Sequence, residues 1–568
     1  MKENFKAKLL SKDAGKPEWI VFAIWVVLVC IIRHFHEPWF DETQAWQIAR
    51  FASIKEILTE VCHYEGHPPL WYFVLMPFAR MGLPHKITIF CITMVFNCVS
   101  MYLLLFRSPF PRWLKCYIPF TFFIFYLQSV HTRPYCMTGL SIFLAAMFYK
   151  ERNQKPARYV LSLIFLCFTS AYGVLIAAGL CLVWTGEIIA EYCQKKNYRE
   201  VVKDKRFWWL WVILICALLL YVCCSPAKDV FFGKFSHENF MSRLQYFPLF
   251  IFDSTFGTIM HEDDILNIQS MFFLGCIIGI LMWIGVIPLL RQNKKLLVTI
   301  VPYLICTFFA VAVYFELHNL GTFTLFFIFI LWILFDDEIK IPKIYKDLTQ
   351  KVNSSFILKL SKTIITMMFC MPLLYTVVSS YLEIVHPYGP QEVLDFIDKN
   401  NIENRKILIN WKWKSDNPMP WDETLPIENN TTITINQPLY MPLTVTIKAL
   451  SHNDNNFYSY FNTYQNQKQW QIWKYTTDEE NKKIFEQWQK IGLPDFIIGS
   501  CPIEYVFSEE QLKGITYYWI GDYKYGKIWK LDYMEGWEHI YIRSDLLQEY
   551  PQFEIKKYGR ILTEPITD

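Results

Sequence analysis

Three short stretches of the chain carry side chains that could act on a sugar, a hydroxyl or a phosphate. Asp41 and Glu42 are adjacent in "FDETQ", His67 opens "HPPLWY", and Arg133 and Tyr135 belong to "HTRPYCMTGL". A carboxylate or an imidazole can accept a proton from a hydroxyl. A guanidinium has a planar fork that matches phosphate oxygens. These types permit acid–base and phosphate chemistry, but each stretch also has a structural explanation.

The structural explanations are local. Asp41 precedes a helical pattern, and Gln44 follows three residues later, as in a capping box. Glu42 would then be a first-turn acid that the helix dipole favours. His67 could cap the helix that two prolines begin, and Arg133 could extend to lipid headgroups. The surrounding elements are needed to choose between the two interpretations.

Composition indicates an integral membrane protein. Of 568 residues, 53% are hydrophobic and 18% aromatic, more than a soluble domain carries. The net charge of +3 argues against nucleic acid as a partner. Most of the 16 cysteines lie in apolar runs, and no CxxC pair has zinc spacing. The apolar run at 19–32 follows a polar, Lys-rich start and has no small-residue cleavage site, which predicts a retained first span.

The apolar stretches predict about eleven membrane-spanning helices. They fall at 18–35, 87–106, 114–130, 135–149, 158–172, 174–190, 207–223, 271–290, 296–315, 320–335 and 364–382. Alternate loops such as "RSPFPRWLK" and "RQNKK" are basic. By the positive-inside rule these loops are cytoplasmic, as is the N-terminal segment 1–17. An odd number of spans places the chain beyond about residue 383 outside the cell membrane.

Three pieces are expected on the outer face: the loop 36–85, the loop 224–270 and the segment 383–568. The first predicts three short helices, the second beginning at a Ser53–Glu56 capping box and the third at the His-Pro-Pro. In the second loop, "HEDD" at 261–264 is expected to be a solvated, flexible lid. The third predicts an α/β domain, with a helix and strand in 392–410, a strand at 444–450 and a helix and strand in 477–500.

Together, the three motifs on one predicted face resemble a known family. The acidic pair Asp41-Glu42, the "HPPLWY" at 67–72 and the "TRPY" at 132–135 resemble motifs of the GT-C superfamily of membrane glycosyltransferases. They are most similar to the bacterial branch related to protein O-mannosyltransferases and to the aminoarabinose transferase of lipid A (glycosyltransferase family 39-like). The resemblance covers roughly residues 18–335 and implies the GT-C fold.

The resemblance implies transfer of a hexose or pentose from a polyprenyl-phosphate donor to an acceptor glycan, lipid or protein. Asp41 would be the base that deprotonates the acceptor hydroxyl, with inversion at the anomeric carbon. Glu42 would bind the acceptor, or share a divalent ion such as Mg²⁺ or Mn²⁺ with Asp41. Arg133, followed by Tyr135, would contact the donor phosphate.

Further candidates are His67, which could donate to sugar or phosphate, and Glu316 and His318 in "YFELHNLGTF". His318 resembles a histidine that directly precedes a glycine in related enzymes, although here two residues intervene. Three other functions stay open: a transporter or flippase of lipid-linked sugars, a polysaccharide polymerase or ligase, and an inactive scaffold. Near-absence of charge in mid-span argues against coupled transport.

Overall fold

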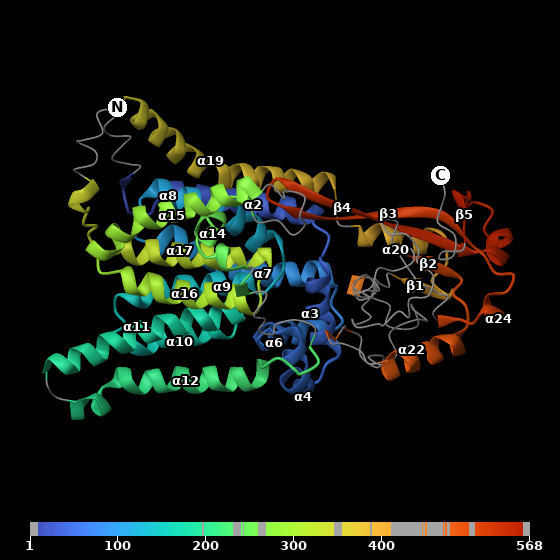
Figure 1. The fold of residues 1–568 in the computed structure, drawn as a ribbon, viewed down its shortest axis with the longest axis horizontal. Coiled ribbons are helices and arrows are strands. Elements are labelled where there is room, and N and C mark those ends of the chain that lie inside the picture. Colours follow the sequence, from blue (N-terminus) through green and yellow to red (C-terminus); the bar gives the residue numbers. More distant parts are fainter. Residues whose placement is uncertain are drawn as a thin grey trace.

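The structure, a computed structural model of the full chain, describes residues 10–195, 198–230, 240–241, 243–259, 269–345, 355–386, 389–409, 478–498 and 506–559. It also describes six single positions, namely 446, 449, 450, 470, 472 and 473. A bundle of long helices occupies one half of the molecule, and a small sheet flanked by helices occupies the other (Figure 1). The "HEDD" sequence predicted to be a lid lies outside the described residues.

Seven helices among the described residues are long and apolar enough to cross a membrane. Four of them are α2 (Lys16–Phe35), α11 (Ala171–Lys195), α12 (Lys205–Cys224) and α7 (His85–Tyr102) with η2 (Leu103–Arg107). The others lie in α15 (Gln269–Gln292), η8 (Leu317–Asn319) with α17 (Leu320–Phe335), and α19 (Ser355–Val385). Three shorter apolar helices are α9 (Tyr135–Tyr149), α10 (Pro156–Cys167) and α16 (Leu296–Ala312). The architecture is that of a polytopic membrane protein, and the count of about eleven spans stays a prediction.

The stretch 114–130 differs from the single helix that was predicted. It consists of α8 (Arg112–Tyr117), the 3₁₀ turn η3 (Ile118–Phe120) and the π-helical η4 (Phe123–Val130). Pro119 lies in the 3₁₀ turn. Because proline has no N–H and its ring clashes with the preceding turn, an α-helix cannot continue through it undisturbed. The remaining bundle elements are η5 (Tyr198–Lys203), η6 (Leu244–Tyr246) and α14 (Leu249–Asp253).

The segment 36–85 folds into short helices at one end of the bundle. They are α3 (Phe40–Phe51), α4 (Ile54–Glu56), η1 (Ile57–Val61), α5 (Cys62–Glu65) and α6 (Leu70–Arg80). The box at Ser53 is confirmed: its Oγ accepts from the N–H of Glu56 at 3.1 Å, and the Glu56 carboxylate accepts from the N–H of Ser53 at 2.8 Å. The predicted cap at Asp41 is wrong. Trp39 is the N-cap, and Glu42 accepts its N–H at 2.8 Å.

The described residues from Pro390 onward form the other half of the molecule, which we call the C-terminal half, and it contains a five-stranded sheet in the order β1-β2-β4-β3-β5. Strands β1 (Ile407–Ile409) and β2 (Phe496–Ile498) are parallel, whereas β3 (Tyr517–Trp529), β4 (Asp532–Arg543) and β5 (Lys557–Gly559) pair antiparallel. The helices are α20 (Pro390–Lys399), α22 (Asp478–Ile491), α24 (Glu509–Leu512) and η10 (Ser544–Glu549). Both predicted helix–strand units, α20–β1 and α22–β2, are confirmed.

The strand predicted at 444–450 is wrong wherever the structure describes it, because Thr446, Ala449 and Leu450 are helical. The Thr446 hydroxyl lies 3.0 Å from that of Thr43, and Ala449 packs into the apolar cluster of the 36–85 segment. Alternating Thr and Val favour a strand, but such local preferences yield to tertiary contacts like those of Thr446 and Ala449.

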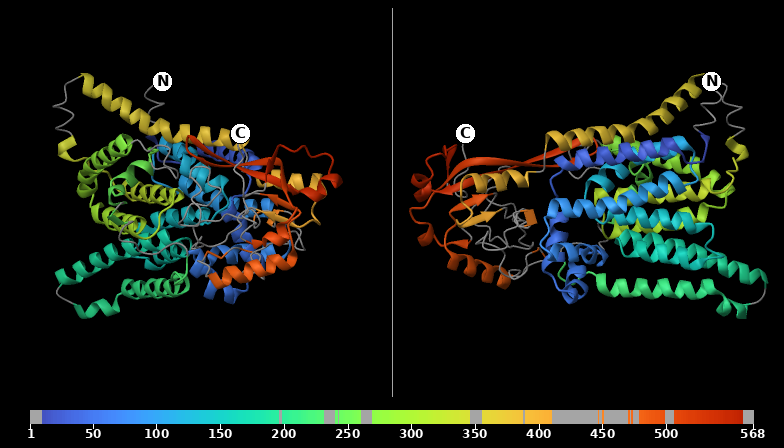
Figure 2. Two further views of the ribbon diagram at one scale, coloured as in Figure 1. Left: turned by 45° about the vertical axis from the view of Figure 1, so that its right-hand side comes forward. Right: turned by 180° about the vertical axis from the view of Figure 1, so that it is seen from behind.

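The hairpin β3–β4 joins the two halves. It lies along α2 and α19, and its tip enters the bundle (Figures 1 and 2). Trp529 is 1% exposed, and its ring centroid lies 5.4 Å from that of Phe122. The Lys530 ammonium donates to the carbonyls of Asp253 and Gly257. The C-terminal half is therefore anchored in the bundle by a buried contact.

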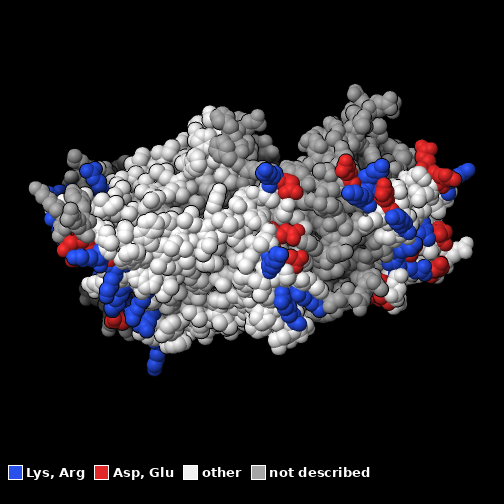
Figure 3. Space-filling model, turned by 90° about the horizontal axis from the view of Figure 1, so that it is seen from below, with Lys and Arg blue, Asp and Glu red and all other residues white. Residues whose placement is uncertain are grey.

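Charged side chains gather at the two ends of the bundle. Between them, one face of the helices shows a broad band without Lys, Arg, Asp or Glu (Figure 3). Such a band matches the hydrocarbon core of a bilayer. The segment 36–85 and the C-terminal half lie together at one end, which we call the site end.

Candidate active site

A small cavity at the site end brings together three of the predicted residues. Asp41 comes from α3, His67 from the turn before α6, and Arg133 from the turn between η4 and α9, and all three line it. Glu65 and Trp71 line the same cavity. Its volume is about 20 Å³, room for about one water molecule. The three motifs, separate in the sequence, therefore form one site.

An ion pair between Asp41 and Arg133 lies at the centre of this site. Arg133 Nη1 is 2.8 Å from Asp41 Oδ2. The Arg133 side chain is 6% exposed and the Asp41 side chain 45% exposed, so the cation is held inside while the carboxylate reaches solvent. Burial lowers the pKa of Arg133, but Asp41 together with Tyr135, Tyr314 and Glu42 outweighs this effect and the pKa is raised. Arg133 is a permanent positive charge.

Tyr135 and His318 lie behind the arginine. The Arg133 guanidinium is 5.1 Å from the centroid of the Tyr135 ring, a cation–π distance. The Tyr135 and His318 rings are 5.7 Å apart. Glu316, at the N-cap of η8, is near enough to Tyr135 for its charge to act on it. Glu316 and His318 thus lie near Tyr135 and do not line the small cavity.

Glu65 belongs to the site but was missed in the sequence. Burial raises its pKa to about 8, with the negative charge of Asp41 acting in the same direction. Gln44 Nε2 donates to Glu65 Oε1 at 2.8 Å. Gly66, which follows, has a φ of +64°, a left-handed conformation that favours glycine and reverses the chain. The sequence signal was this glycine, which turns the chain between the carboxyl and His67.

His67 is neutral at physiological pH. Burial and the nearby Arg133 lower its pKa to about 4, against the opposing effect of Asp41. Glu65 is mostly protonated at pH 7, so it too is uncharged. The fixed charges around the cavity are therefore those of Asp41 and Arg133, and the two neutral groups can donate or accept hydrogen bonds.

Glu42 lies away from this cavity in a fully buried polar network. Its Oε1 accepts from the Thr132 hydroxyl at 2.7 Å and from the Thr132 N–H, and its Oε2 is 2.9 Å from His36 Nε2. His36 Nδ1 lies 2.6 Å from Glu383, and Arg33 Nη1 is 3.7 Å from Glu42. Burial raises the pKa of Glu42, but the cationic groups outweigh it and hold the pKa well below its usual value. Glu42 thus ties α3 to α2 and η4.

Asp41 and Glu42 have different partners because consecutive side chains on a helix point about 100° apart. A divalent ion shared by them stays a prediction. Among the described residues, Glu42 instead groups with His36 and His131, whose ligand atoms lie within 4.8 Å of one another. His131 is fully buried, and neither of its ring nitrogens has a hydrogen-bond partner. This group and a cysteine trio are the described side-chain sets that could hold a metal ion.

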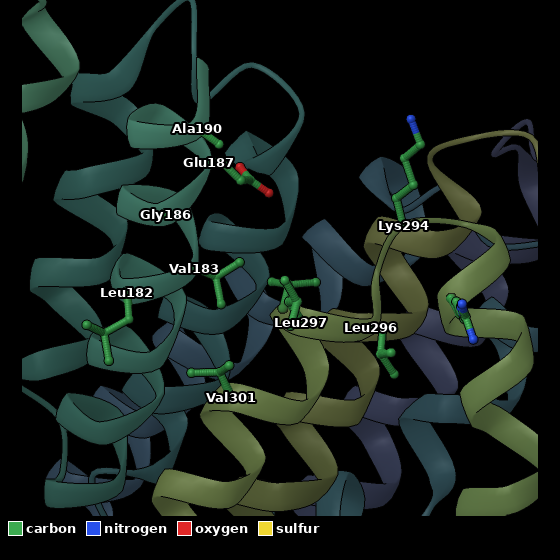
Figure 4. A pocket seen from close by; sticks show the side chains of 11 residues that line it. Leu182, Val183, Gly186, Glu187, Ala190, Lys294, Leu296, Leu297 and Val301 are labelled. Carbon is green, nitrogen blue, oxygen red and sulfur yellow. The ribbon is translucent and has the colours of Figure 1, made fainter. Parts of the chain in front are cut away.

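A larger hollow of about 580 Å³ lies elsewhere, between α11 and α16. Leu182, Val183, Leu297 and Val301 line it, while the Lys294 side chain extends away from them (Figure 4). None of the predicted site residues lines it. Most of its lining side chains are apolar, and the charged ones are Glu187, Arg291 and Lys294.

Comparison of the chain with protein-family models, with curated proteins and with solved structures finds no match. The functional interpretation therefore depends on the geometry of the site and on the motifs in the sequence.

Proposed function

We propose that the chain is a membrane glycosyltransferase of the GT-C type that takes its sugar from a polyprenyl phosphate. The observation that carries the proposal is the pair of a half-exposed Asp41 and a buried Arg133. The pair lines a cavity at the bundle end next to the C-terminal half. A carboxylate open to solvent can meet an acceptor hydroxyl, and a buried guanidinium can hold a phosphate delivered from the bilayer.

In the proposed reaction, the acceptor oxygen attacks the anomeric carbon while the bond from that carbon to the phosphate oxygen breaks. The electron pair of that bond leaves with the polyprenyl phosphate, whose charge Arg133 stabilises. The hydroxyl proton passes to Asp41. Attack opposite the leaving group inverts the configuration. Before the donor binds, Asp41 neutralises Arg133; the phosphate then takes over part of this role, which frees the carboxylate to act as the base.

Neutral side chains at Glu65 and His67 are compatible with the negative charge of a polyprenyl-phosphate donor. A second ionised carboxylate beside Asp41 would repel a phosphate in a confined site, since charges interact strongly away from water. As neutral groups, both can hydrogen-bond sugar hydroxyls. The C-terminal half lies beside the site: the ring of Phe40, next to Asp41, is 5.5 Å from that of Trp473. This position supports a role in presenting the acceptor.

The experiment measures consumption of a panel of polyprenyl-phosphate sugars by membranes containing the full chain, with acceptor extract supplied. Wild type should consume one donor, and Asp41→Asn should lose about 10²- to 10⁴-fold of the rate, the usual contribution of a positioned base. Asp13→Asn, an exposed carboxylate near the far end of α2, is the matched control and should keep full activity. Correct folding of each variant is checked by its elution profile in detergent.

Equal rates for wild type and Asp41→Asn would refute the assignment of the base. If no protein consumes any donor, glycosyl transfer itself fails, and movement of lipid-linked sugars across proteoliposome membranes is the next activity to measure.

A further inference from the structure

Three cysteines lie together directly behind the wall of the cavity. Cys62 begins α5, and Cys223 and Cys224 end α12. Their sulfur atoms lie within 4.8 Å of one another. Cys62 is fully buried, and the other two are partly buried. The proposed glycosyl transfer uses none of these thiols.

The surrounding contacts hold the trio in place from both sides. His63 Nδ1 lies 2.6 Å from the carbonyl of Ser225, and the Ala227 N–H donates to the carbonyl of His63 at 3.3 Å. The Tyr64 hydroxyl donates to Asp229 at 2.8 Å. The chain after α12 is thus bound to α5 by three bonds that do not involve sulfur. A site held by its neighbours in this way is preorganised for a ligand.

We propose that Cys62, Cys223 and Cys224 form a thiolate site for a thiophilic d¹⁰ cation such as Zn²⁺. A tetrahedral ion with Zn–S bonds of about 2.3 Å places its sulfur ligands about 3.8 Å apart. The sulfur separations of at most 4.8 Å need only a small adjustment to reach this value. An ion engages all three sulfurs, whereas a disulfide engages two and leaves the third unpaired.

The fourth ligand is water, since the group whose ligand atoms lie within 4.8 Å of one another consists of the three cysteines alone among the described residues. His63 is near enough to Cys223 for an electrostatic interaction. Binding of Zn²⁺ releases the thiol protons to solvent, and three thiolates with one Zn²⁺ carry a net charge of −1.

The ion would link α5 and the turn that contains His67 to the end of α12. Cys62 precedes Glu65 in the same short helix α5, and Cys224 Sγ lies 3.8 Å from the carbonyl of His67. Joining them to α12 fixes the wall on which Glu65 and His67 lie. The metal site does not depend on the proposed glycosyl transfer.

The test uses the full chain, purified in detergent with a reductant and then loaded with Zn²⁺ or Co²⁺. Wild type should retain one equivalent of Zn²⁺ by mass spectrometry and show a thiolate-to-Co²⁺ charge-transfer band in the near ultraviolet. Cys62→Ser and Cys223→Ser should bind at least about tenfold more weakly. Cys167→Ser, which changes a buried cysteine of α10 outside the trio, should bind as wild type does.

Chelation provides a second readout that does not depend on folding of the variants. Removing Zn²⁺ from wild type should lower its melting temperature, and re-addition should restore it. A wild-type chain without bound metal or a Co²⁺ band would overturn the proposal. Peptide mapping without reductant could instead find a disulfide from Cys62 to Cys223 or Cys224. If that chain also binds no metal after reduction, the proposal is overturned. Wild-type metal binding by Cys62→Ser would overturn it as well.

Discussion

Replacement of Glu65 by glutamine tests the electrostatics of the site through stability alone. The native pKa of Glu65 is about 8, against about 4.3 for an unfolded glutamate. Between these two values the unfolded chain releases a proton that the native protein keeps. Stability therefore falls as pH rises through this window and levels off above the native pKa. Glutamine never ionises, so Glu65→Gln removes this loss.

The size of this stability difference follows from the shift in the pKa of Glu65. One pKa unit corresponds to about 1.4 kcal/mol, so the full shift would lower the free energy of unfolding of wild type by about 5 kcal/mol at pH 8. This value is an upper bound, because Glu65 is not completely shielded from solvent. The glutamine side-chain oxygen can still accept the hydrogen bond from Gln44. The charged or titratable groups that face Glu65 are Asp41, His67, Tyr72 and Arg133.

The assay is the melting temperature of purified protein between pH 5 and pH 9. Near pH 5 the two proteins should be similar, and at pH 8 Glu65→Gln should melt higher by on the order of 2–4 °C. Glu554→Gln, which changes an exposed glutamate, should show no pH-dependent difference from wild type. If Glu65→Gln melts lower than wild type at pH 8, or if the difference does not vary with pH, Glu65 is ionised in the native protein and the reasoning is refuted.

Two further predictions concern the buried contacts that hold the site. Glu42→Gln should destabilise the protein by about 3 kcal/mol, because it removes the carboxylate beside the buried charge of Arg33 and leaves His36 with Glu383 alone of its two carboxylates. The measurement is the melting temperature at pH 7, and an unchanged value would contradict the network. Trp529→Ala should cost about 3–5 kcal/mol and speed proteolytic release of the C-terminal half, whereas Leu531→Ala, at a side chain that is 42% exposed, should do neither. Equal cleavage of these two variants would mean that the hairpin tip is not the anchor.

Most helices follow from local features of the sequence. Apolar runs predict the long helices because backbone N–H and C=O groups inside a bilayer must be hydrogen-bonded within their own segment, as they are in a helix. This requirement does not depend on the rest of the chain. The box at Ser53 and the two helix–strand units of the C-terminal half also depend on near neighbours. Where distant contacts compete, local signals fail. Asp41 is directed to Arg133 and not to its own helix end, and Thr446, Ala449 and Leu450 are helical, with Thr446 in contact with Thr43 of α3.

The sequence by itself determined the membrane architecture and the three motifs from which the cavity is built, since hydropathy and motif order are properties of consecutive residues. Only the tertiary structure decided how each side chain is used. It directs Asp41 into the cavity and Glu42 into a buried network. It also raises the pKa of Glu65 and brings Cys62 beside Cys223. Burial and Coulomb interactions depend on distance in space, and the folded chain sets those distances between segments that are far apart in sequence.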